Sequence, residues 1–171
     1  MKVKRWDVVA GLCLLRGYRM GAEIGVAGGR FTTYLCSVMP TMKMVAVDLW
    51  QVLPDRDEPG SETYETWQLD RMYTVFKDHC DKFFPDRVAI KRTSTIDAAK
   101  EVADGSLDFA FIDADHSYSG ASGDIAAWGP KIRQGGMLCG HDYNWPTVKR
   151  AVDEIGTPDV FPDNVWVLWR E

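Results

Sequence analysis

The chain has 171 residues, of which 46% are hydrophobic and 26% charged, a composition typical of one soluble globular domain and inconsistent with a disordered chain. The formal charge is −5 at pH 7, and the longest basic cluster comprises only Lys2, Lys4 and Arg5. Proteins that bind nucleic acids usually show a basic excess or stripe, so a nucleic-acid partner is disfavoured. No apolar run approaches the roughly 18 residues that a membrane span needs, and we expect no membrane association.

The four cysteines lie far apart in the sequence, at Cys13, Cys36, Cys80 and Cys139. No pair has the CxxC spacing of zinc ribbons or thioredoxin-like motifs. Cys36 and Cys139 fall in apolar patterns, where a free thiol behaves as a small buried hydrophobe. This usage favours a reducing compartment, and we expect a cytoplasmic protein. The length predicts a single domain over residues 1–171.

Helix-like and strand-like patterns alternate from the start of the chain. The first four elements are predicted at 8–15 (an amphipathic helix), 22–26 (strand), 31–39 (helix, ended by Pro40) and 44–49 (strand). The polar segment 51–61 carries two prolines and a glycine, and it predicts a mobile loop. A helix is predicted next at 62–84, where apolar residues recur at helical spacing.

The same alternation continues to the end. The later elements are predicted at 87–91 (strand), 96–102 (helix), 107–112 (strand), 119–132 (helix), 137–139 (strand, after a turn at Gly135 and Gly136), 147–155 (helix) and 165–169 (strand). Repeated strand–helix units predict an α/β fold, a three-layer sandwich whose mostly parallel sheet carries helices on both faces. Ligands of such sheets bind beyond the carboxyl ends of the strands, so the residues that follow each strand are the candidate functional residues.

The first predicted strand ends in a glycine-rich turn, EIGVAGGR. A dinucleotide fingerprint requires GxGxxG, but Ala27 and Arg30 occupy the second and third glycine positions, which disfavours NAD or FAD. The spacing ExGxxxG, formed by Glu23, Gly25 and Gly29, is similar to the S-adenosylmethionine loop of class I methyltransferases. An acidic residue beside this loop suits a cationic ligand, and a glycine-rich turn without a ligand is the alternative.

The next two strand ends add three candidates. Asp48 ends the second strand about 20 residues after the loop, where a carboxylate can accept both hydroxyl protons of a ribose. Trp50 could flank an adenine ring, and core packing is the alternative. Ser94 follows the third strand, where it could meet the adenine edge or cap the next helix.

Carboxylates and imidazoles follow the fourth and fifth strands. Asp113 and His116 lie in IDADHSY, and His141 and Asp142 follow the next strand. Neighbouring ends of parallel strands meet at one edge, so Asp113, His141 and Asp142 could hold one divalent cation. Mg²⁺ prefers oxygen ligands, whereas the imidazole favours Mn²⁺ or another transition metal. His116 is placed to act as a general base. A polar cluster without metal is the alternative, and the isolated His79 is interpreted as structural.

Together these segments resemble a known family. The stretch FAFIDADHSYSGASGDIAAWGPKIRQGGMLCGHDYNWPTVKRAVDE, with AEIGVAGGRFTTYL and VAVDLW, resembles class I S-adenosylmethionine-dependent methyltransferases over roughly residues 20–155. Within this family, the chain most resembles the branch that contains macrocin-type O-methyltransferases and cephalosporin-hydroxylase-like proteins. The resemblance implies a Rossmann-like sheet of seven strands with the last strand antiparallel. It implies cofactor contacts at Glu23, Gly25, Gly29 and Asp48. The predicted cofactor site also includes Val26, Trp50, Ser94 and Asp113.

The resemblance also bears on the cation. In the metal-dependent branch of the family, the aspartate of a DxxH motif binds Mg²⁺ and its histidine is the base, and Asp113 and His116 have that spacing. A second acidic pair completes the site there, whereas this chain has His141 and Asp142, so an imidazole replaces one carboxylate. The identity of the metal, and whether one is used, therefore stay open.

We hypothesise methyl transfer from S-adenosylmethionine to a small-molecule oxygen, with His116 and Asp113 as catalytic residues, assisted by Mg²⁺ or Mn²⁺. The acceptor is not indicated by the sequence. Its specificity is expected from the first 20 residues, from segments 51–61 and 143–145, or from another subunit. Seven tryptophans leave room for an aromatic interface in a homo-oligomer. A nicotinamide-dependent oxidoreductase and a non-catalytic S-adenosylmethionine-binding protein are the alternatives.

Overall fold

The computed structural model describes residues 2–52 and 64–171. Most of the predicted loop at 51–61, and the first two residues of the helix predicted at 62–84, lie outside these described residues. The strands are β1 (Met20–Ile24), β2 (Lys43–Asp48), β3 (Val88–Arg92), β4 (Leu107–Ile112), β5 (Ile132–Gly140), β6 (Asp159–Phe161) and β7 (Val165–Trp169). The helices are α1 (Arg5–Arg16), α2 (Arg30–Val38), α3 (Thr66–Phe83), α4 (Thr95–Lys100), α5 (Tyr118–Trp128) and α6 (Pro146–Asp153), with 3₁₀ turns η1 (Gly129–Lys131) and η2 (Pro162–Asn164).

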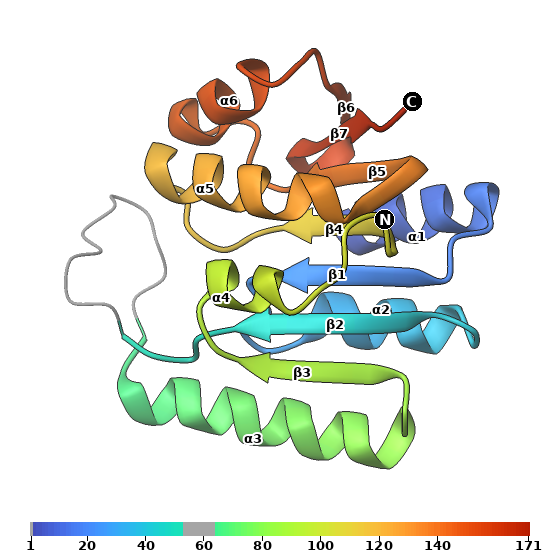
Figure 1. Ribbon diagram of the computed structural model, residues 1–171. Coiled ribbons are helices and arrows are strands. Elements are labelled where there is room, and N and C mark those ends of the chain that lie inside the picture. Colours follow the sequence, from blue (N-terminus) through green and yellow to red (C-terminus); the bar gives the residue numbers. More distant parts are fainter. Residues whose placement is uncertain (1, 53–63) are drawn as a thin grey trace.

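The strands form one sheet in the order β3-β2-β1-β4-β5-β7-β6 (Figure 1). β1 to β5 pair in parallel with one another, and β7 is antiparallel to both β5 and β6. The predicted α/β fold, a mostly parallel seven-stranded sheet with an antiparallel last strand, is confirmed. The strand order reverses between β1 and β4, so a ligand site is expected beyond the carboxyl ends of these two strands.

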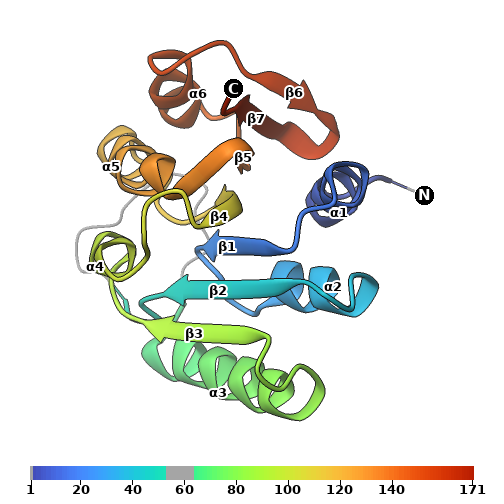
Figure 2. The same ribbon diagram turned by 45° about the vertical axis from the view of Figure 1, so that its right-hand side comes forward.

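Helices cover both faces of the sheet (Figure 2). Alternate residues of a strand point to opposite faces, so Phe109 and Phe111 pack with α1, α2 and α3, whereas Ala110 and Ile112 pack with α4, α5 and α6. The two hydrophobic cores make three layers, as the alternating pattern predicts. None of the helices in the described parts of the chain has the length and apolar character that a membrane crossing requires.

Three details of the predicted elements were wrong. The helix predicted at 119–132 ends at Trp128, because Pro130 has no N–H to donate and the chain turns through η1 into β5. Gly135 and Gly136, predicted to form a turn before a short strand, lie inside β5, where its register with β4 shifts. The three-residue edge strand β6 was missed, since it is too short to show a period.

Candidate active site

The loop between β1 and α2 depends on two glycines. Gly25 has a φ of +92°, and a Cβ atom there would overlap the carbonyl oxygen of Asp113 at the end of β4. Gly29 precedes α2 with a φ of +74°, and a Cβ there would overlap the ring of Phe76. Only glycine tolerates both the left-handed backbone and the close packing. The loop therefore lies directly against the end of β4, at the point where the strand order reverses.

Asp48 connects this loop to the end of β2. Its Oδ2 atom accepts the backbone N–H groups of Val26 and Ala27, each at 2.9 Å, and its Oδ1 atom accepts the N–H of Trp50 at 2.7 Å. In this structure the carboxylate holds the loop in place. A carboxylate oxygen has two lone pairs, so Oδ1 can still accept one sugar hydroxyl. The ribose-binding role of Asp48 stays a prediction.

The two residues predicted near adenine have structural roles in this conformation. The Trp50 side chain is buried, its indole N–H donates to the Ala27 carbonyl at 2.9 Å, and its ring lies 5.1 Å from that of Tyr73. Ser94 caps α4, because its hydroxyl accepts the N–H of Asp97 at 3.1 Å. Both show the structural alternative that the sequence left open, and their contacts with a cofactor stay predictions.

Glu23 is a buried carboxyl group between β1 and α2, only 3% exposed. It accepts the backbone N–H of Thr32 at 3.1 Å and the hydroxyl of Thr32 at 2.5 Å, which satisfies an N–H group in the first turn of α2. Burial raises the pKa of Glu23 to about 8. Burial therefore disfavours the negative charge that the sequence analysis expected beside a cationic ligand, and the cofactor contact of Glu23 stays a prediction.

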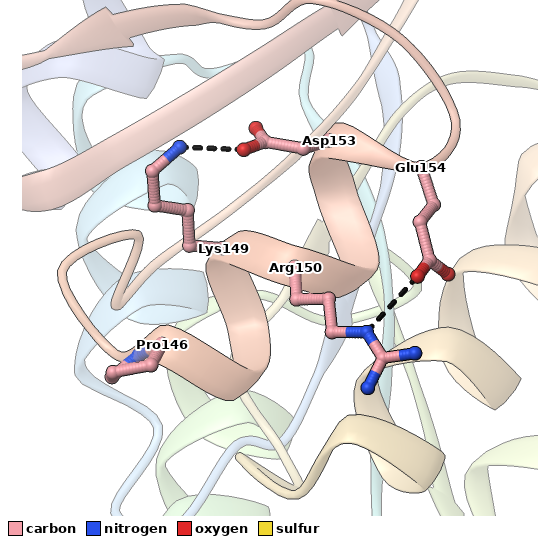
Figure 3. A pocket seen from close by; sticks show the side chains of 5 residues that line it. All are labelled: Pro146, Lys149, Arg150, Asp153 and Glu154. Carbon is pink, nitrogen blue, oxygen red and sulfur yellow. Dashed lines mark hydrogen bonds and ion pairs between the residues drawn. The ribbon is translucent and has the colours of Figure 1, made fainter.

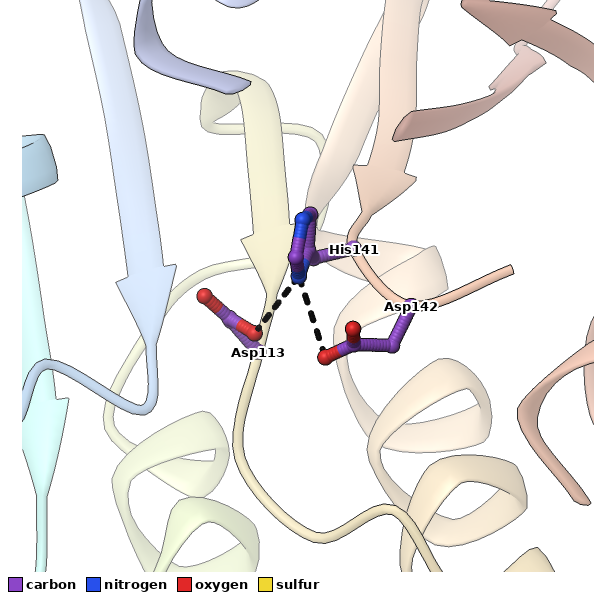
Figure 4. Close-up of side chains that lie close together, drawn as sticks. All are labelled: Asp113, His141 and Asp142. Atoms are coloured by element: carbon purple, nitrogen blue, oxygen red, sulfur yellow. Dashed lines mark ion pairs between the residues drawn. The ribbon is translucent and has the colours of Figure 1, made fainter. Parts of the chain in front are cut away.

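The polar residues that follow β4 and β5 come together at one edge of the sheet (Figure 4). His141 Nδ1 lies 3.0 Å from Asp142 Oδ2 and 3.7 Å from Asp113 Oδ1. His116 Nε2 lies 2.8 Å from the same Asp142 oxygen and 4.0 Å from Asp113 Oδ1. Each of these carboxyl groups thus faces two imidazoles. We call these four residues the Asp–His cluster.

His116 is held in the Asp–His cluster from α6 and the turn before it. The Thr147 hydroxyl donates to the His116 carbonyl at 2.6 Å, and the Trp145 ring lies 4.8 Å from the imidazole. Its neighbours Asp113 and Asp142 raise the pKa of His116 to about 10 despite its burial. Burial opposes ionisation of Asp142, but the two adjacent imidazoles hold the pKa of that carboxyl below its usual range. In this arrangement His116 is protonated at neutral pH.

Two charged residues beside the Asp–His cluster were missed by the sequence analysis. Arg5, in the first turn of α1, places Nε 3.3 Å from Asp113 Oδ2. Asp163, in η2, accepts the backbone N–H of Arg5 at 2.9 Å and lies 3.9 Å from His141 Nε2. Arg5 was noted only as part of a small basic cluster. No local sequence motif places either residue at the site, because 158 positions separate Arg5 from Asp163.

The Asp–His cluster fits a divalent cation. Asp113, His141 and Asp142 each offer one ligand atom, and these three atoms lie within 4.8 Å of one another. Two carboxylate oxygens and one imidazole nitrogen suit Mn²⁺ or Mg²⁺ completed by water. Buried nitrogens without a hydrogen-bond partner in the described chain include Arg5 Nε, His116 Nε2 and His141 Nε2. His116 Nε2 is close to Asp142 but not aligned to donate to it, so the cluster does not satisfy itself.

Two surface cavities lie away from the Asp–His cluster. One, of about 410 Å³, lies along α6 (Figure 3), where Lys149 pairs with Asp153 at 2.5 Å and Arg150 with Glu154 at 3.0 Å. The other, of about 340 Å³, lies over α2 between Trp6 and His79. The ion pairs on α6 join residues one turn apart, which is the usual pattern of an exposed helix face. We therefore place the candidate chemistry at the Asp–His cluster and not in either cavity.

Comparison with known proteins gives a family match. A family model described as a methyltransferase domain matches residues 22–143, well over half of the chain. The matched segment contains the glycine-rich loop, Asp48 and the whole Asp–His cluster. No curated protein sequence matches the chain.

Solved structures share the fold. A candidate caffeoyl-CoA O-methyltransferase from Staphylococcus aureus aligns with a TM-score of 0.70 at 16% identity, over 98% of this chain and 84% of that chain. An O-methyltransferase from Bacillus cereus in complex with SAH aligns with a TM-score of 0.65 at 16% identity, over 97% and 80%. A TDP-rhamnose 3'-O-methyltransferase of calicheamicin biosynthesis aligns with a TM-score of 0.64 at 15% identity, over 97% and 80%.

Proposed function

The chain belongs to the methyltransferase domain family, and from this premise we propose that it transfers the methyl group of S-adenosylmethionine to a hydroxyl oxygen of a small molecule. The observation that carries the proposal is the position of the glycine-rich loop, which lies directly against Asp113 and hence beside the Asp–His cluster. Solved structures of the same fold that are described as O-methyltransferases favour oxygen as the acceptor atom. The net charge of −5 favours a small molecule over a nucleic acid.

The cofactor lies, in this proposal, against residues 25–29, with its ribose hydroxyls on Asp48 and its adenine towards Trp50 and Ser94. S-adenosylmethionine, when bound, supplies a methyl group that its sulfonium has already activated. The protein's main task is therefore alignment, and correct alignment can supply several kcal/mol of the barrier. Gly25 allows the loop and the end of β4 to approach closely enough to bring both reactants to one edge.

The acceptor hydroxyl must also lose its proton. We assign this proton to His116 Nε2, which faces Asp113 and Asp142. A protonated imidazole cannot accept the hydroxyl proton. Because Asp113 and Asp142 keep His116 protonated, their negative charge must first be compensated. Asp113, His141 and Asp142 would hold Mg²⁺ or Mn²⁺, which when bound supplies positive charge that lowers the pKa of the hydroxyl. With the two carboxylates engaged in this way, the pKa of His116 would return towards its ordinary range.

Within the family we propose the branch that contains the macrocin-type O-methyltransferases, on the strength of the residues from Phe109 to Glu154 quoted above. Segment 143–145 carries the proposed acceptor contacts, because Trp145 lies against His116. The Tyr143 hydroxyl donates to Asp153 on α6 at 2.6 Å in this conformation. All four cysteines are free and buried, which supports a cytoplasmic location.

The function is tested with S-adenosylhomocysteine, NADH and a His116→Ala variant. We expect calorimetry to show that the wild type and His116→Ala bind S-adenosylhomocysteine with similar affinity and that neither binds NADH. With an acceptor found by screening hydroxylated compounds for S-adenosylhomocysteine release, turnover should fall by about 10²–10⁴-fold in the variant, the scale of lost general-base catalysis.

The matched control is His79→Ala, since His79 is exposed on α3, where its ring lies beside those of Phe83 and Phe84. Turnover of this control should equal that of the wild type. Near-normal turnover of His116→Ala would remove His116 from the mechanism. NADH binding in place of S-adenosylhomocysteine binding would favour the oxidoreductase.

A further inference from the structure

Arg5 is fixed beside Asp113 by the fold. Its Nε atom lies 3.3 Å from Asp113 Oδ2, and the Arg5 backbone N–H donates to Asp163 Oδ2 at 2.9 Å. The Asp113 side chain is only 13% exposed, so few solvent molecules can compensate its charge. The first turn of α1 therefore places a permanent positive charge on one of the three proposed cation ligands.

The contact between Arg5 and Asp113 is an ion pair and not a hydrogen bond. Arg5 Nε is buried, yet it has no hydrogen-bond partner within the described residues. A guanidinium that binds a carboxylate in its preferred geometry forms two parallel N–H···O bonds. Arg5 lacks this geometry, so its hold on Asp113 is mainly Coulombic and can be displaced by a stronger positive charge.

We infer that Arg5 is a built-in counter-cation of Asp113 that competes with the divalent cation and thereby sets how tightly the Asp–His cluster binds it. The inference rests on the proposed function, because it presupposes a cation on Asp113, His141 and Asp142. A divalent ion on Asp113 and the guanidinium beside it repel each other strongly, since both lie near the same part-buried carboxylate. Arg5 is thus a positioning residue that acts through Asp113.

The test is Mn²⁺ binding, measured by calorimetry on the wild type, Arg5→Gln, Arg5→Lys and Arg16→Gln. Arg5→Gln removes the charge and should bind Mn²⁺ roughly ten-fold or more tightly than the wild type. Arg5→Lys keeps the charge and should stay near the wild type. Arg16→Gln removes an arginine from the other end of α1, where it stacks on Trp169, and should also stay near the wild type.

Two further measurements locate the effect and separate it from the proposed function. Asp142→Asn should lose Mn²⁺ binding, which places the ion at the Asp–His cluster, and circular dichroism checks that each variant is folded. Unchanged or weaker Mn²⁺ binding by Arg5→Gln overturns the inference. If none of the proteins binds Mn²⁺, the inference about Arg5 is wrong, and so is the cation in the proposed function. S-adenosylhomocysteine binding in the same samples reports separately on the cofactor site that the proposed function requires.

Discussion

Glu23 shows how burial changes the charge state that a sequence position implies. The sequence predicts that this acidic position faces a positive ligand, whereas the carboxyl group is buried and bound to Thr32. Burial dominates its energetics, because a charged carboxylate loses much hydration in a protein core. Its charge state thus depends on packing that a single sequence does not display.

The stability of the protein should therefore fall with rising pH in a window set by Glu23. The folded state keeps this proton up to about pH 8, whereas an unfolded chain releases it above about 4.5. Between these values the folded state binds the extra proton, so the free energy of unfolding decreases as pH rises. We expect this single group to contribute a loss on the order of 3–5 kcal/mol across the window.

A Glu23→Gln variant tests this expectation. The amide can accept the same two hydrogen bonds from Thr32 but does not ionise, so its free energy of unfolding should vary less between pH 4.5 and 8 than that of the wild type. Urea denaturation at several pH values measures the difference, with the exposed Glu171→Gln as control. Parallel curves for Glu23→Gln and the wild type would show that Glu23 ionises normally.

The same limit applies to Asp48 and Trp50. The sequence located both at the end of β2, and the structure places them beside the loop from Gly25 to Gly29. The sequence could not reveal that the Asp48 carboxylate already accepts the backbone N–H groups of Val26 and Ala27, because those contacts depend on the path of the loop.

At the scale of elements, this loop makes different demands on its neighbouring glycines. Gly29 requires a positive φ and has no space for a Cβ atom beside Phe76, whereas Gly28 has no positive φ and no atom within 4 Å of a Cβ. The two positions thus form a matched pair, adjacent in sequence and opposite in steric requirement.

Gly29→Ala should lower the free energy of unfolding by about 2–4 kcal/mol, from backbone strain together with overpacking against Phe76. Gly28→Ala should change it by less than about 1 kcal/mol. Urea denaturation of both variants measures this difference. Equal stability of the two variants would mean that the loop adapts, and that Gly29 does not fix the packing of the loop against Phe76.

Element types were easier to predict than their boundaries. The buried strands β2 and β4 each contain a run of four apolar residues, and β7 was predicted at its observed bounds because Val165–Trp169 is apolar throughout. β5 was predicted too short, since Gly135 and Gly136 usually signal a turn. Here the antiparallel neighbour overrides that preference, as Gly135 donates its N–H to the Arg170 carbonyl at 2.7 Å.

For the whole molecule, the cysteines report on how complete the packing is. All four are free and buried, and they lie on α1, α2, α3 and β5. Burial raises the pKa of Cys36 to about 11 and that of Cys80 to about 12. Because the thiolate is the reactive form, these thiols should be inert at neutral pH.

We expect a thiol reagent to modify the native protein slowly and all four cysteines of the urea-unfolded protein rapidly. Mass spectrometry should also show one mass with and without reductant, as no disulfide forms. Rapid modification of one cysteine in the native protein would show that its surrounding core opens readily.

The sequence predicted the residues of the candidate site that directly follow a strand. Asp113, His116, His141 and Asp142 could be grouped because parallel strands end at one edge, a property of the whole sheet. Arg5 and Asp163 could not, because they arrive from the first helix and from the turn before the last strand. Contacts across nearly the full length of the chain leave no local pattern.

The hydrogen bond from Arg5 to Asp163 has a practical consequence for handling the protein. It fastens the start of α1 to the edge of the Asp–His cluster, so a purification tag fused ahead of α1 would crowd that cluster even though it is remote in primary structure. A tag is therefore better placed after β7.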